Sequence, residues 1–398
     1  MKTCGLDVHK DTIFCAIYNG KSYSEVKEFS TLTPEIVKMS DYLKSEGVKR
    51  VAMESTSTYW IPVWDILYQL EFELMLVNPF LIKQMPGRKS DVKDAQWIAC
   101  LLHKGLLRGS FVPNPIIQEL RTYTRSYTKL QAQKARCLTQ MDRILIRCGI
   151  HLSSCVSSLN TKSVINVINA LIAGESDPDS LSKLVYGNKA NKTSGKLKQA
   201  LTGNLKAHHI LELSWKKQEY DLVEKQLSEC LSRMESICRA HYNNELELLQ
   251  TIPGISLVSA ITLIAETGGD MKVFENSSKL TGWAGLRPRN DESAGKYQST
   301  ATTKGNKYLR TILVQIAWAA VRTKRSFFME KFNRLAMRKS RKKALIAIAR
   351  KILVVVWNVL EKKNIYNPVM THVYDPEKLV NRLKYHQAEL EKVRKQIG

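Results

Sequence analysis

The sequence predicts an α/β domain at the N-terminus, long helices in the middle of the chain and a mainly α-helical domain toward the C-terminus. Strand-like runs alternate with helical runs in residues 1–110, two heptad patterns occupy much of residues 111–245, and apolar helical runs dominate residues 246–365. Residues 366–398 form a basic tail. With 398 residues and 44% hydrophobic content, the chain can form roughly two or three domains with their own cores.

Residues 1–110 are expected to form a mixed β-sheet with helices. Five runs have strand character, at residues 3–8, 12–18, 23–29, 50–53 and 73–77. Two runs have helical periodicity, at residues 34–46 and 59–70. The first three strands follow one another closely, which predicts an antiparallel meander. The later alternation of helix and strand is typical of an α/β domain.

Four acids stand at the ends of these predicted elements. Asp7 ends the first strand and Glu54 ends the fourth. Asp91 and Asp94 open a later helix, which Ser90 can cap with its hydroxyl. This pair shares one helix face, and alone it is typical of an ordinary helix start, where acids favour the positive end of the dipole. Together with Asp7 and Glu54 the pair predicts a metal site, for which Mg²⁺ is expected because it prefers oxygen ligands.

Residues 111–245 are predicted to contain two long helices with an inserted subdomain of unknown role at about 153–205. Read as heptads, residues 118–148 and the helix beginning at Leu213 place mostly apolar residues along one seam. The polar exceptions are Lys134, Lys216 and His241. Helices of this kind form a coiled coil with each other or with copies in another protomer, and we expect a homo-oligomer, either a dimer or a tetramer.

Two features of residues 246–365 point toward phosphate. The turn Ile252-Pro253-Gly254-Ile255 between two apolar helical runs resembles a helix-hairpin-helix, in which Gly254 allows a close backbone approach and the next helix offers free N–H groups. An ordinary helical hairpin is the alternative. Residues 280–310 form a Gly-, Ser- and Thr-rich basic loop, where small neighbours leave the hydroxyl of Ser293 accessible. A flexible linker is the alternative for this loop.

Charge is distributed unevenly along the chain. The formal net charge is +24; residues 1–110 carry 14 Lys and Arg against 13 Asp and Glu, whereas residues 321–398 carry 20 against 6. This surplus indicates a polyanionic partner, namely nucleic acid. The Lys and Arg residues on the two long helices fit two interpretations equally well: they form a solvated helix face, or they contact the phosphate backbone. The candidates for nucleic-acid contact are Lys89, Arg121, Arg125, Lys129, Gly254, Arg287, Arg289, Lys296, Lys304, Lys307 and Arg310.

The cysteines and apolar segments bear on where the protein works. None of the eight cysteines forms a CxxC pair, and several occupy apolar positions, which favours buried, reduced thiols. The chain opens without a secretory signal, and its most apolar late segment, 344–360, is interrupted by Arg350 and Lys351. We therefore expect a cytoplasmic protein without a membrane partner. The tail is expected to be a charged amphipathic helix or disordered, and its role stays open.

Several of these segments, taken in order, resemble the DEDD-type transposases of the insertion-sequence one-ten family, which also includes the Piv DNA invertase. The matching segments are Gly5-Leu6-Asp7-Val8-His9-Lys10, Met53-Glu54-Ser55-Thr56, Lys89-Ser90-Asp91-Val92-Lys93-Asp94-Ala95, Ile252-Pro253-Gly254-Ile255, Gly285-Leu286 with Pro288, Ser293-Ala294-Gly295, Lys304-Gly305-Asn306 with Leu309-Arg310, and the helix 344–357. The match spans most of residues 1–360. It leaves out the insertion at about 153–205 and the tail.

The resemblance implies a RuvC-like N-terminal domain of ribonuclease H fold, whose four acids correspond to Asp7, Glu54, Asp91 and Asp94 and hold two Mg²⁺. It also implies a C-terminal transposase domain with a nucleophilic serine, which by position is Ser293. The partners that it implies are donor and target double-stranded DNA and a structured guide RNA, the bridge RNA. The expected function is transposition or site-specific DNA recombination through a covalent phosphoserine intermediate. Two alternatives stay open: a RuvC-like junction nuclease that uses water, and a non-catalytic, basic, coiled-coil DNA-binding protein.

Overall fold

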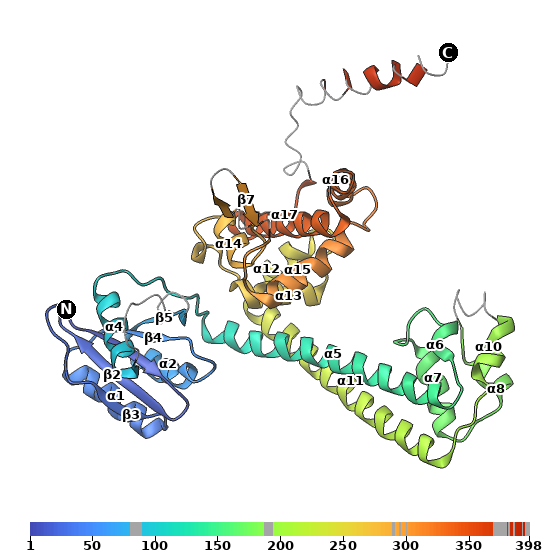
Figure 1. The fold of residues 1–398 in the computed structure, drawn as a ribbon, viewed down its shortest axis with the longest axis horizontal. Helices are drawn as coiled ribbons and strands as arrows, with labels where there is room; N and C mark the ends of the chain where they lie inside the picture. Colours follow the sequence, from blue (N-terminus) through green and yellow to red (C-terminus); the bar gives the residue numbers. More distant parts are fainter. Residues whose placement is uncertain are drawn as a thin grey trace. The chain divides into compact units, whose positions relative to one another are not determined.

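The computed structural model describes residues 1–79, 90–186, 194–288, 291–293, 296–299 and 301–368, with a few residues between 380 and 394. The chain forms two compact units, Met1–Pro113 and Asn114–Gly398 (Figure 1). Among the described residues, no helix combines the length and the apolar character needed to cross a membrane.

The first unit contains a five-stranded mixed sheet with the order β3-β2-β1-β4-β5. Its strands are β1 (Thr3–Val8), β2 (Thr12–Tyr18), β3 (Lys27–Ser30), β4 (Arg50–Glu54) and β5 (Glu73–Val77). The pairs β1–β2 and β2–β3 are antiparallel, and the pairs β1–β4 and β4–β5 are parallel. The predicted meander and mixed sheet are confirmed. The third strand starts later than residue 23, because Tyr23 makes only an isolated bridge to Tyr18.

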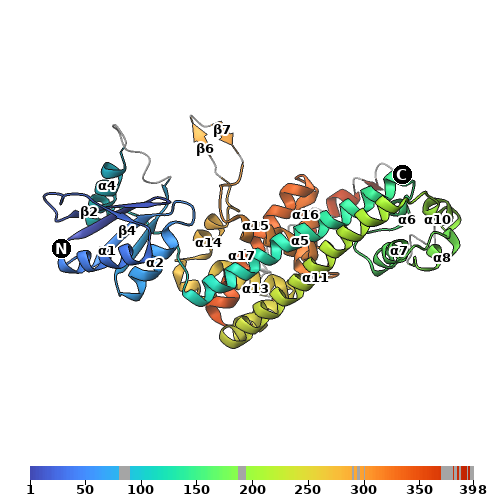
Figure 2. The same cartoon turned by 90° about the horizontal axis from the view of Figure 1, so that it is seen from below.

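Helices cover both faces of this sheet (Figure 2). On one face, α1 (Thr33–Ser45) and α2 (Trp60–Gln69) share a core with alternate strand residues, including Leu6 and Met53. On the other face lies α4 (Asp91–His103), whose Ile98 and Leu102 pack with Ala52 and Val77. Because side chains alternate along a strand, Asp7 and Glu54 are assigned to the face that α4 covers.

Gly5 lets α4 lie directly against β1. A Cβ atom at this position would be 2.2 Å from the carbonyl oxygen of Ala95 and 2.4 Å from the amide nitrogen of Ala99. The hydroxyl of Thr3 donates to the carbonyl oxygen of Ala99 at 3.0 Å on the same face. This close contact fixes the position of the first turn of α4 relative to the end of β1.

The second unit begins with two long helices, α5 (Pro115–Arg147) and α11 (Ala207–His241), which pack along each other (Figure 1). Most of the predicted seam is buried, including Leu120, Cys137 and Met141 of α5. Lys134 interrupts the apolar seam, but it forms an ion pair with Glu224 of α11. The helices thus pair within one chain, and the expected homo-oligomer stays a prediction.

The insertion between these helices has its own small core. It contains α6 (Leu152–Cys155), α7 (Lys162–Ile172), α8 (Pro178–Lys183) and α10 (Ser194–Leu201). Their apolar residues, such as Val167 and Leu181, pack with the end of the helix pair, including Leu145 and Leu213. The insertion therefore extends the helix pair as a packed structure.

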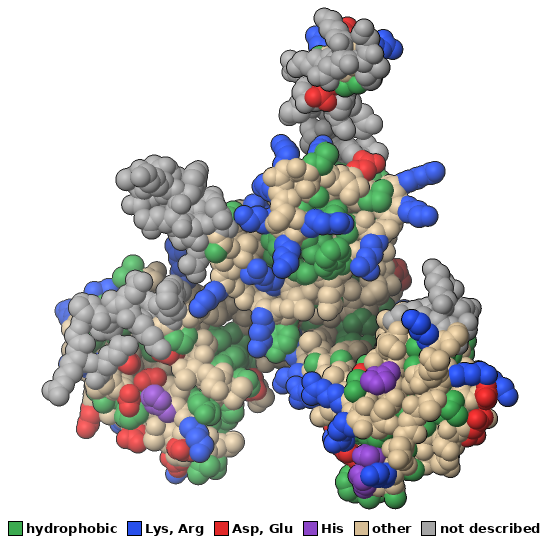
Figure 3. All heavy atoms as spheres, turned by 45° about the vertical axis from the view of Figure 1, so that its right-hand side comes forward, with side chains coloured by type: hydrophobic (Ala, Val, Ile, Leu, Met, Phe, Trp, Pro, Cys, Tyr) green, Lys and Arg blue, Asp and Glu red, His purple; other side chains and the backbone are tan. Residues whose placement is uncertain are grey.

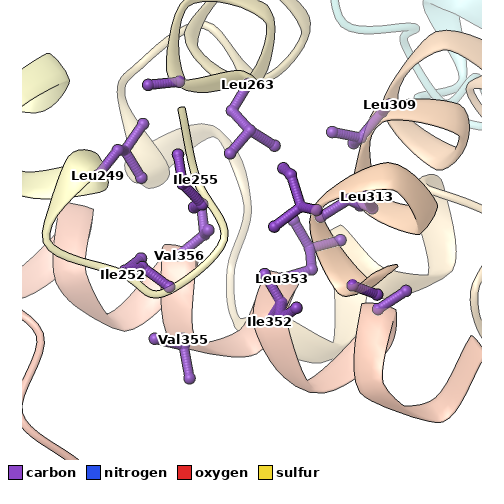
Figure 4. Close-up of a cluster of buried hydrophobic side chains, with 14 of the residues drawn as sticks. Leu249, Ile252, Ile255, Leu263, Leu309, Leu313, Ile352, Leu353, Val355 and Val356 are labelled. Atoms are coloured by element: carbon purple, nitrogen blue, oxygen red, sulfur yellow. The ribbon is translucent and has the colours of Figure 1, made fainter. Parts of the chain in front are cut away.

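The C-terminal part is a helical domain around α17 (Arg341–Lys362). The surrounding elements are α12 (Asn243–Gln250), α13 (Leu257–Thr267), the 3₁₀ turn η1 (Met271–Val273), α14 (Ser277–Trp283), α15 (Lys307–Ala320) and α16 (Phe327–Ala336). Figure 4 shows side chains from α12, α13, α15 and α17 meeting in its core, among them Leu249, Leu313 and Leu353. Residues 280–310 were predicted to be a loop, but in the structure they contain a hairpin of β6 (Asp291–Ser293) and β7 (Lys296–Ser299). Most of the predicted tail lies outside the described residues.

Candidate functional site

Two of the predicted acids come from neighbouring parallel strands. Leu6 of β1 is in register with Met53 of β4, so the next residues, Asp7 and Glu54, lie side by side at the ends of these strands. Asp7 is 5% exposed, and Glu54 is half-buried. The hydroxyl of Thr56 donates to a carboxylate oxygen of Glu54 at 3.0 Å. The sheet thus brings two carboxylates to one edge.

Helix α4 adds a third carboxylate from the adjacent face. Ser90 caps this helix by accepting a bond from the backbone N–H of Lys93, as predicted. One carboxylate oxygen of Asp91 is 3.7 Å from Nε2 of His9, and the same Nε2 is 3.2 Å from a carboxylate oxygen of Asp7. The possible ligand atoms of Asp7, His9 and Asp91 all lie within 4.8 Å of one another. Asp94 is half-buried one turn further along α4 and is not part of this group.

The carboxylate of Asp7 is in an unfavourable place for a negative charge. The pKa of Asp7 is raised to about 6, and burial is the largest cause. The nearby carboxylates of Glu54 and Asp91 also act to raise this pKa, whereas His9 acts to lower it. A divalent cation would relieve this concentration of negative charge. The oxygen donors of Asp7 and Asp91 suit a hard cation such as Mg²⁺, and the imidazole of His9 adds a nitrogen donor. The residues present therefore fit a divalent metal ion.

Sequence reasoning assigned no role to two residues of this site. Gly5 permits the contact between β1 and α4, and His9 lies between the carboxylates of Asp7 and Asp91. Both belong to the segment 5–10, which was recognised only as a motif. A histidine two residues after a strand-terminal aspartate was the available signal for His9. The contact at Gly5 depends on tertiary packing and had no local signal.

Ser293 is the last residue of β6 and pairs with Lys296 of β7. It belongs to the second unit, whereas the acids belong to the first. Its role, and the role of Lys296, stay predictions. Lys89 and Arg289 lie outside the described residues.

The remaining predicted nucleic-acid contacts fall into two groups. Lys129, Arg287, Lys304 and Lys307 are exposed. Arg310 is half-buried, and its guanidinium donates to the carbonyl oxygen of Gly285 at 3.3 Å. The exposed group is available to a polyanion, and the contact of these residues with nucleic acid stays a prediction.

Arg121 and Arg125, two of the predicted phosphate contacts, make hydrogen bonds within the second unit. Arg125 donates two bonds to the carboxylate of Glu266, at 2.9 and 3.0 Å. Arg121 donates to the backbone carbonyl oxygens of Ala265 and Glu266, at 2.7 and 2.8 Å. Heptad position placed both residues on the helix surface, but it could not indicate that a buried acid of α13 would face them. These bonds tie both arginines to α13, and their contact with nucleic acid stays a prediction.

The predicted turn at Gly254 is packed inside the domain. Gly254 has a φ of +90°, and a Cβ atom there would be 2.6 Å from the amide nitrogen of Ala320 in α15. The flanking Ile252 and Ile255 are buried, and Figure 4 shows them in the core beside Val356 of α17. The close approach that glycine allows is therefore to α15 of the same chain. Contact between this turn and phosphate stays a prediction.

Comparison with known proteins bears on both units. A family model described as transposase matches residues 4–149, and a model described as transposase IS116/IS110/IS902 family matches residues 246–332. A solved structure of T. thermophilus RuvC with a Holliday junction substrate aligns over 28% of this chain and 99% of its own, at 12% identity. Its TM-score of 0.22 is too low to support a conclusion.

Curated relatives match shorter regions. A probable family 20 transposase of Pseudomonas aeruginosa is 27% identical over 35% of this chain and 42% of its own length. The transposase for insertion sequence element IS1111A of Coxiella burnetii is 30% identical over 32% of this chain and 36% of its own length. The pilin gene-inverting protein of Moraxella bovis is 30% identical over 31% of this chain and 39% of its own length. The chain thus spans about two fifths of the length of these relatives. The two family models cover the acid-bearing unit and the domain that contains Ser293, and the chain belongs to the IS116/IS110/IS902 family of transposases.

Proposed function

We propose that this protein is a metal-dependent DNA recombinase that cuts and rejoins DNA strands through a covalent link to Ser293. The observation that carries the proposal is the cluster of Asp7, His9 and Asp91 beside Glu54, at the edge of a mixed sheet, in a member of a transposase family. The sheet order, with two parallel and two antiparallel pairings, supports a ribonuclease H-like unit of the RuvC type.

The acids would hold the metal ions and thereby the scissile phosphate. Asp7, Glu54, Asp91 and Asp94 are the proposed ligands, for two Mg²⁺ ions. When bound, these ions would neutralise charge on the phosphate in an in-line displacement. Because Asp7 has a raised pKa, its carboxyl must give up a proton to act as a ligand at low pH. Asp94, one turn after Asp91 on α4, is the fourth proposed ligand.

The hydroxyl oxygen of Ser293 would attack the phosphorus atom. A new O–P bond forms to the serine, the bond from phosphorus to the departing sugar oxygen breaks, and that oxygen takes up a proton as the serine hydroxyl loses one. The phosphodiester energy is kept in the phosphoserine link, so the reverse attack by a sugar hydroxyl on another strand rejoins the DNA. This chemistry requires Ser293 to meet the acids of the first unit, from the same protomer or from a partner.

Gel assays on a suicide DNA substrate test this proposal. We expect wild-type protein to nick the DNA and accumulate a protein–DNA adduct when Mg²⁺ is present. Ser293→Ala should lose the adduct, and Asp91→Ala should lose cleavage as well. Ser299→Ala, on the other strand of the hairpin, is the matched control and should keep the adduct. An adduct that survives Ser293→Ala, or full recombination by Asp91→Ala, would contradict the proposal.

Two other functions are separable outcomes of the same assay. Metal-dependent nicking without any adduct would indicate a junction nuclease that uses water. DNA binding without nicking would indicate a non-catalytic binding protein. The site of Asp7 and Asp91 favours an enzyme over a binding protein, because clustered carboxylates would repel DNA unless a cation lay between them.

We also propose that the basic C-terminal helices bind nucleic acid, including a structured guide RNA. Residues 321–360 contain twelve Lys and Arg and a single acid, Glu330. Figure 3 shows Lys and Arg side chains spread over these helices with few acids among them. Sequencing the RNA that co-purifies with the protein tests the guide. We expect one RNA species that maps beside the protein's own gene, and bulk cellular RNA would contradict the guide.

A further inference from the structure

A fully buried carboxylate joins three elements of the second unit. Glu266 of α13 is 0% exposed, and its two oxygens accept the two bonds from Arg125 of α5. One of these oxygens also accepts a bond from the side-chain amide of Asn306, at 2.6 Å. A buried charge is costly unless its partners are complete, so this arrangement is sensitive to the loss of any one of them.

Asn306 uses every polar group of its own for contacts at the start of α15. Its side-chain oxygen accepts from the backbone N–H groups of Tyr308 and Leu309, at 3.0 and 3.1 Å, and so caps α15. Its backbone N–H donates to the carbonyl oxygen of Trp283 at the end of α14, at 3.1 Å. Asn306 therefore ties the carboxylate of Glu266 to the place where α14 and α15 meet.

This meeting place is the root of the hairpin that carries Ser293. The root, defined as residues 285–288 and 302–305, connects β6 and β7 to the helices, and Figure 2 shows the hairpin projecting from it. Thr303 donates its backbone N–H to the carbonyl oxygen of Arg287 at 3.0 Å. Gly285 and Gly305 cross so closely that a Cβ atom at Gly305 would be 2.3 Å from the amide nitrogen of Gly285.

We propose that Glu266 is a positioning residue, which fixes the root of the Ser293 hairpin to the long helix α5 through Arg125 and Asn306. Arg125 strengthens the link because its guanidinium also stacks 4.5 Å above the ring of Tyr308. The buried carboxylate adds to the bonds at the root from Arg310 and Thr303. A root that is fixed to the helices limits the directions that the hairpin can take. The assignment rests on the proposed function only in taking Ser293 as the nucleophile.

A pair of single variants and their double variant test this assignment. Asn306→Asp keeps the cap of α15, but it removes the donor and places a second carboxylate against Glu266. In Glu266→Gln, the new side-chain NH₂ group faces a group that donates in the wild type, on either Arg125 or Asn306. Two hydrogen-bond donors then meet without an acceptor. In the double variant, the amide of Gln at 266 can donate to Asp at 306, which restores the bond in the reverse direction. Asn243→Asp is the matched control, since the amide of Asn243 donates to the exposed Glu247 at 2.8 Å.

Two readouts separate positioning from simple folding. Each single variant should bind DNA as tightly as wild type but form the Ser293 adduct about 100-fold more slowly at saturating DNA, as expected for a reacting group displaced by about 1 Å. The double variant should recover most of this rate, and the control should match wild type. Independently of chemistry, hydrogen exchange at the amide of Thr303 should be faster in the single variants and recover in the double variant.

The outcomes also separate this assignment from the proposed function. A wild-type rate of adduct formation in both single variants would overturn the assignment of Glu266. Unchanged exchange at Thr303 would overturn it whatever the chemistry at Ser293. Uniformly faster exchange throughout α13 and α15, without recovery in the double variant, would reduce Glu266 to a fold-stabilising residue and so also overturn it. A wild-type protein without an adduct would overturn the role of Ser293, and the exchange data alone would then decide about Glu266.

Discussion

At the scale of single residues, Asp7 has the strongest electrostatic constraint in the candidate site. Its carboxyl is buried, and it lies near Glu54, Asp91 and His9. A carboxyl whose pKa is raised in the folded state keeps its proton there after the unfolded chain has lost it. Below about pH 4, Asp7 therefore does not change the free energy of unfolding. As the pH rises from about 4 toward 6, Asp7 lowers the free energy of unfolding.

This direction of the pH dependence predicts how an Asp7→Asn variant behaves when a chelator removes metal ions. Above pH 6, the metal-free variant should be more stable than wild type, by at most about 3 kcal/mol for a pKa rise from 3.8 to about 6. At pH 4 the two proteins should have equal stability. Urea unfolding at both pH values measures the difference. A pH-independent difference between Asp7→Asn and wild type would contradict this prediction.

At the scale of elements, the contact between β1 and α4 holds the acids together. Gly5→Ala should force α4 away from β1, because the new methyl group would overlap the backbone at Ala95 and Ala99. We expect a loss of about 1–3 kcal/mol in the free energy of unfolding, and weaker metal binding through displacement of Asp91. Calorimetric titration with Mg²⁺ and urea unfolding measure both effects. Gly195→Ala, in helix α10 where a Cβ atom meets nothing within 4 Å, should not lower stability, since alanine favours a helix more than glycine does.

The turn at Gly254 offers a second test at this scale. Gly254→Ala should lower stability by at least about 2 kcal/mol, because it combines a positive φ with overlap against α15. Gly174 has a similar φ of +92° but nothing within 4 Å, so Gly174→Ala isolates the cost of the backbone conformation. A Gly254→Ala protein that lost DNA affinity at unchanged stability would instead support the phosphate contact.

Local patterns predicted the elements better than their contacts. The five strands, the cap at Ser90 and the burial of Leu120 and Met141 follow from periodicity and turn chemistry within short segments. The bonds from Arg125 to Glu266 join residues far apart in the sequence, so the pattern of α5 alone could not show that this arginine pairs with a buried acid. The hairpin within residues 280–310 was missed because its strands are short and surrounded by Gly and Ser.

At the scale of the whole molecule, charge separates the two ends of the chain. The first unit is nearly neutral and holds the acids, whereas the C-terminal helices carry an excess of cations. Among the described residues, Lys339, Lys342 and Lys343 form no ion pair and are exposed. They are therefore free to neutralise phosphates.

Replacing these three lysines with Gln should weaken nucleic-acid binding and lower its salt dependence. Each lost phosphate contact should reduce the slope of log K against log salt by about 0.9 on duplex DNA. Binding titrations at several salt concentrations measure the slope. Lys38→Gln with Lys217→Gln is the control, since each of these lysines already forms an ion pair with an acid. Equal slopes for the triple variant and wild type would exclude this surface from binding.

The most direct test of the account is to identify the residue that becomes linked to DNA. Wild-type protein is incubated with a suicide substrate and Mg²⁺, digested with nuclease and protease, and analysed by peptide mass spectrometry. The account predicts a nucleotide attached through phosphate to Ser293, absent when a chelator replaces Mg²⁺ and absent from Asp91→Ala. Cleaved DNA without any linked peptide, or a nucleotide attached to another residue, would contradict it.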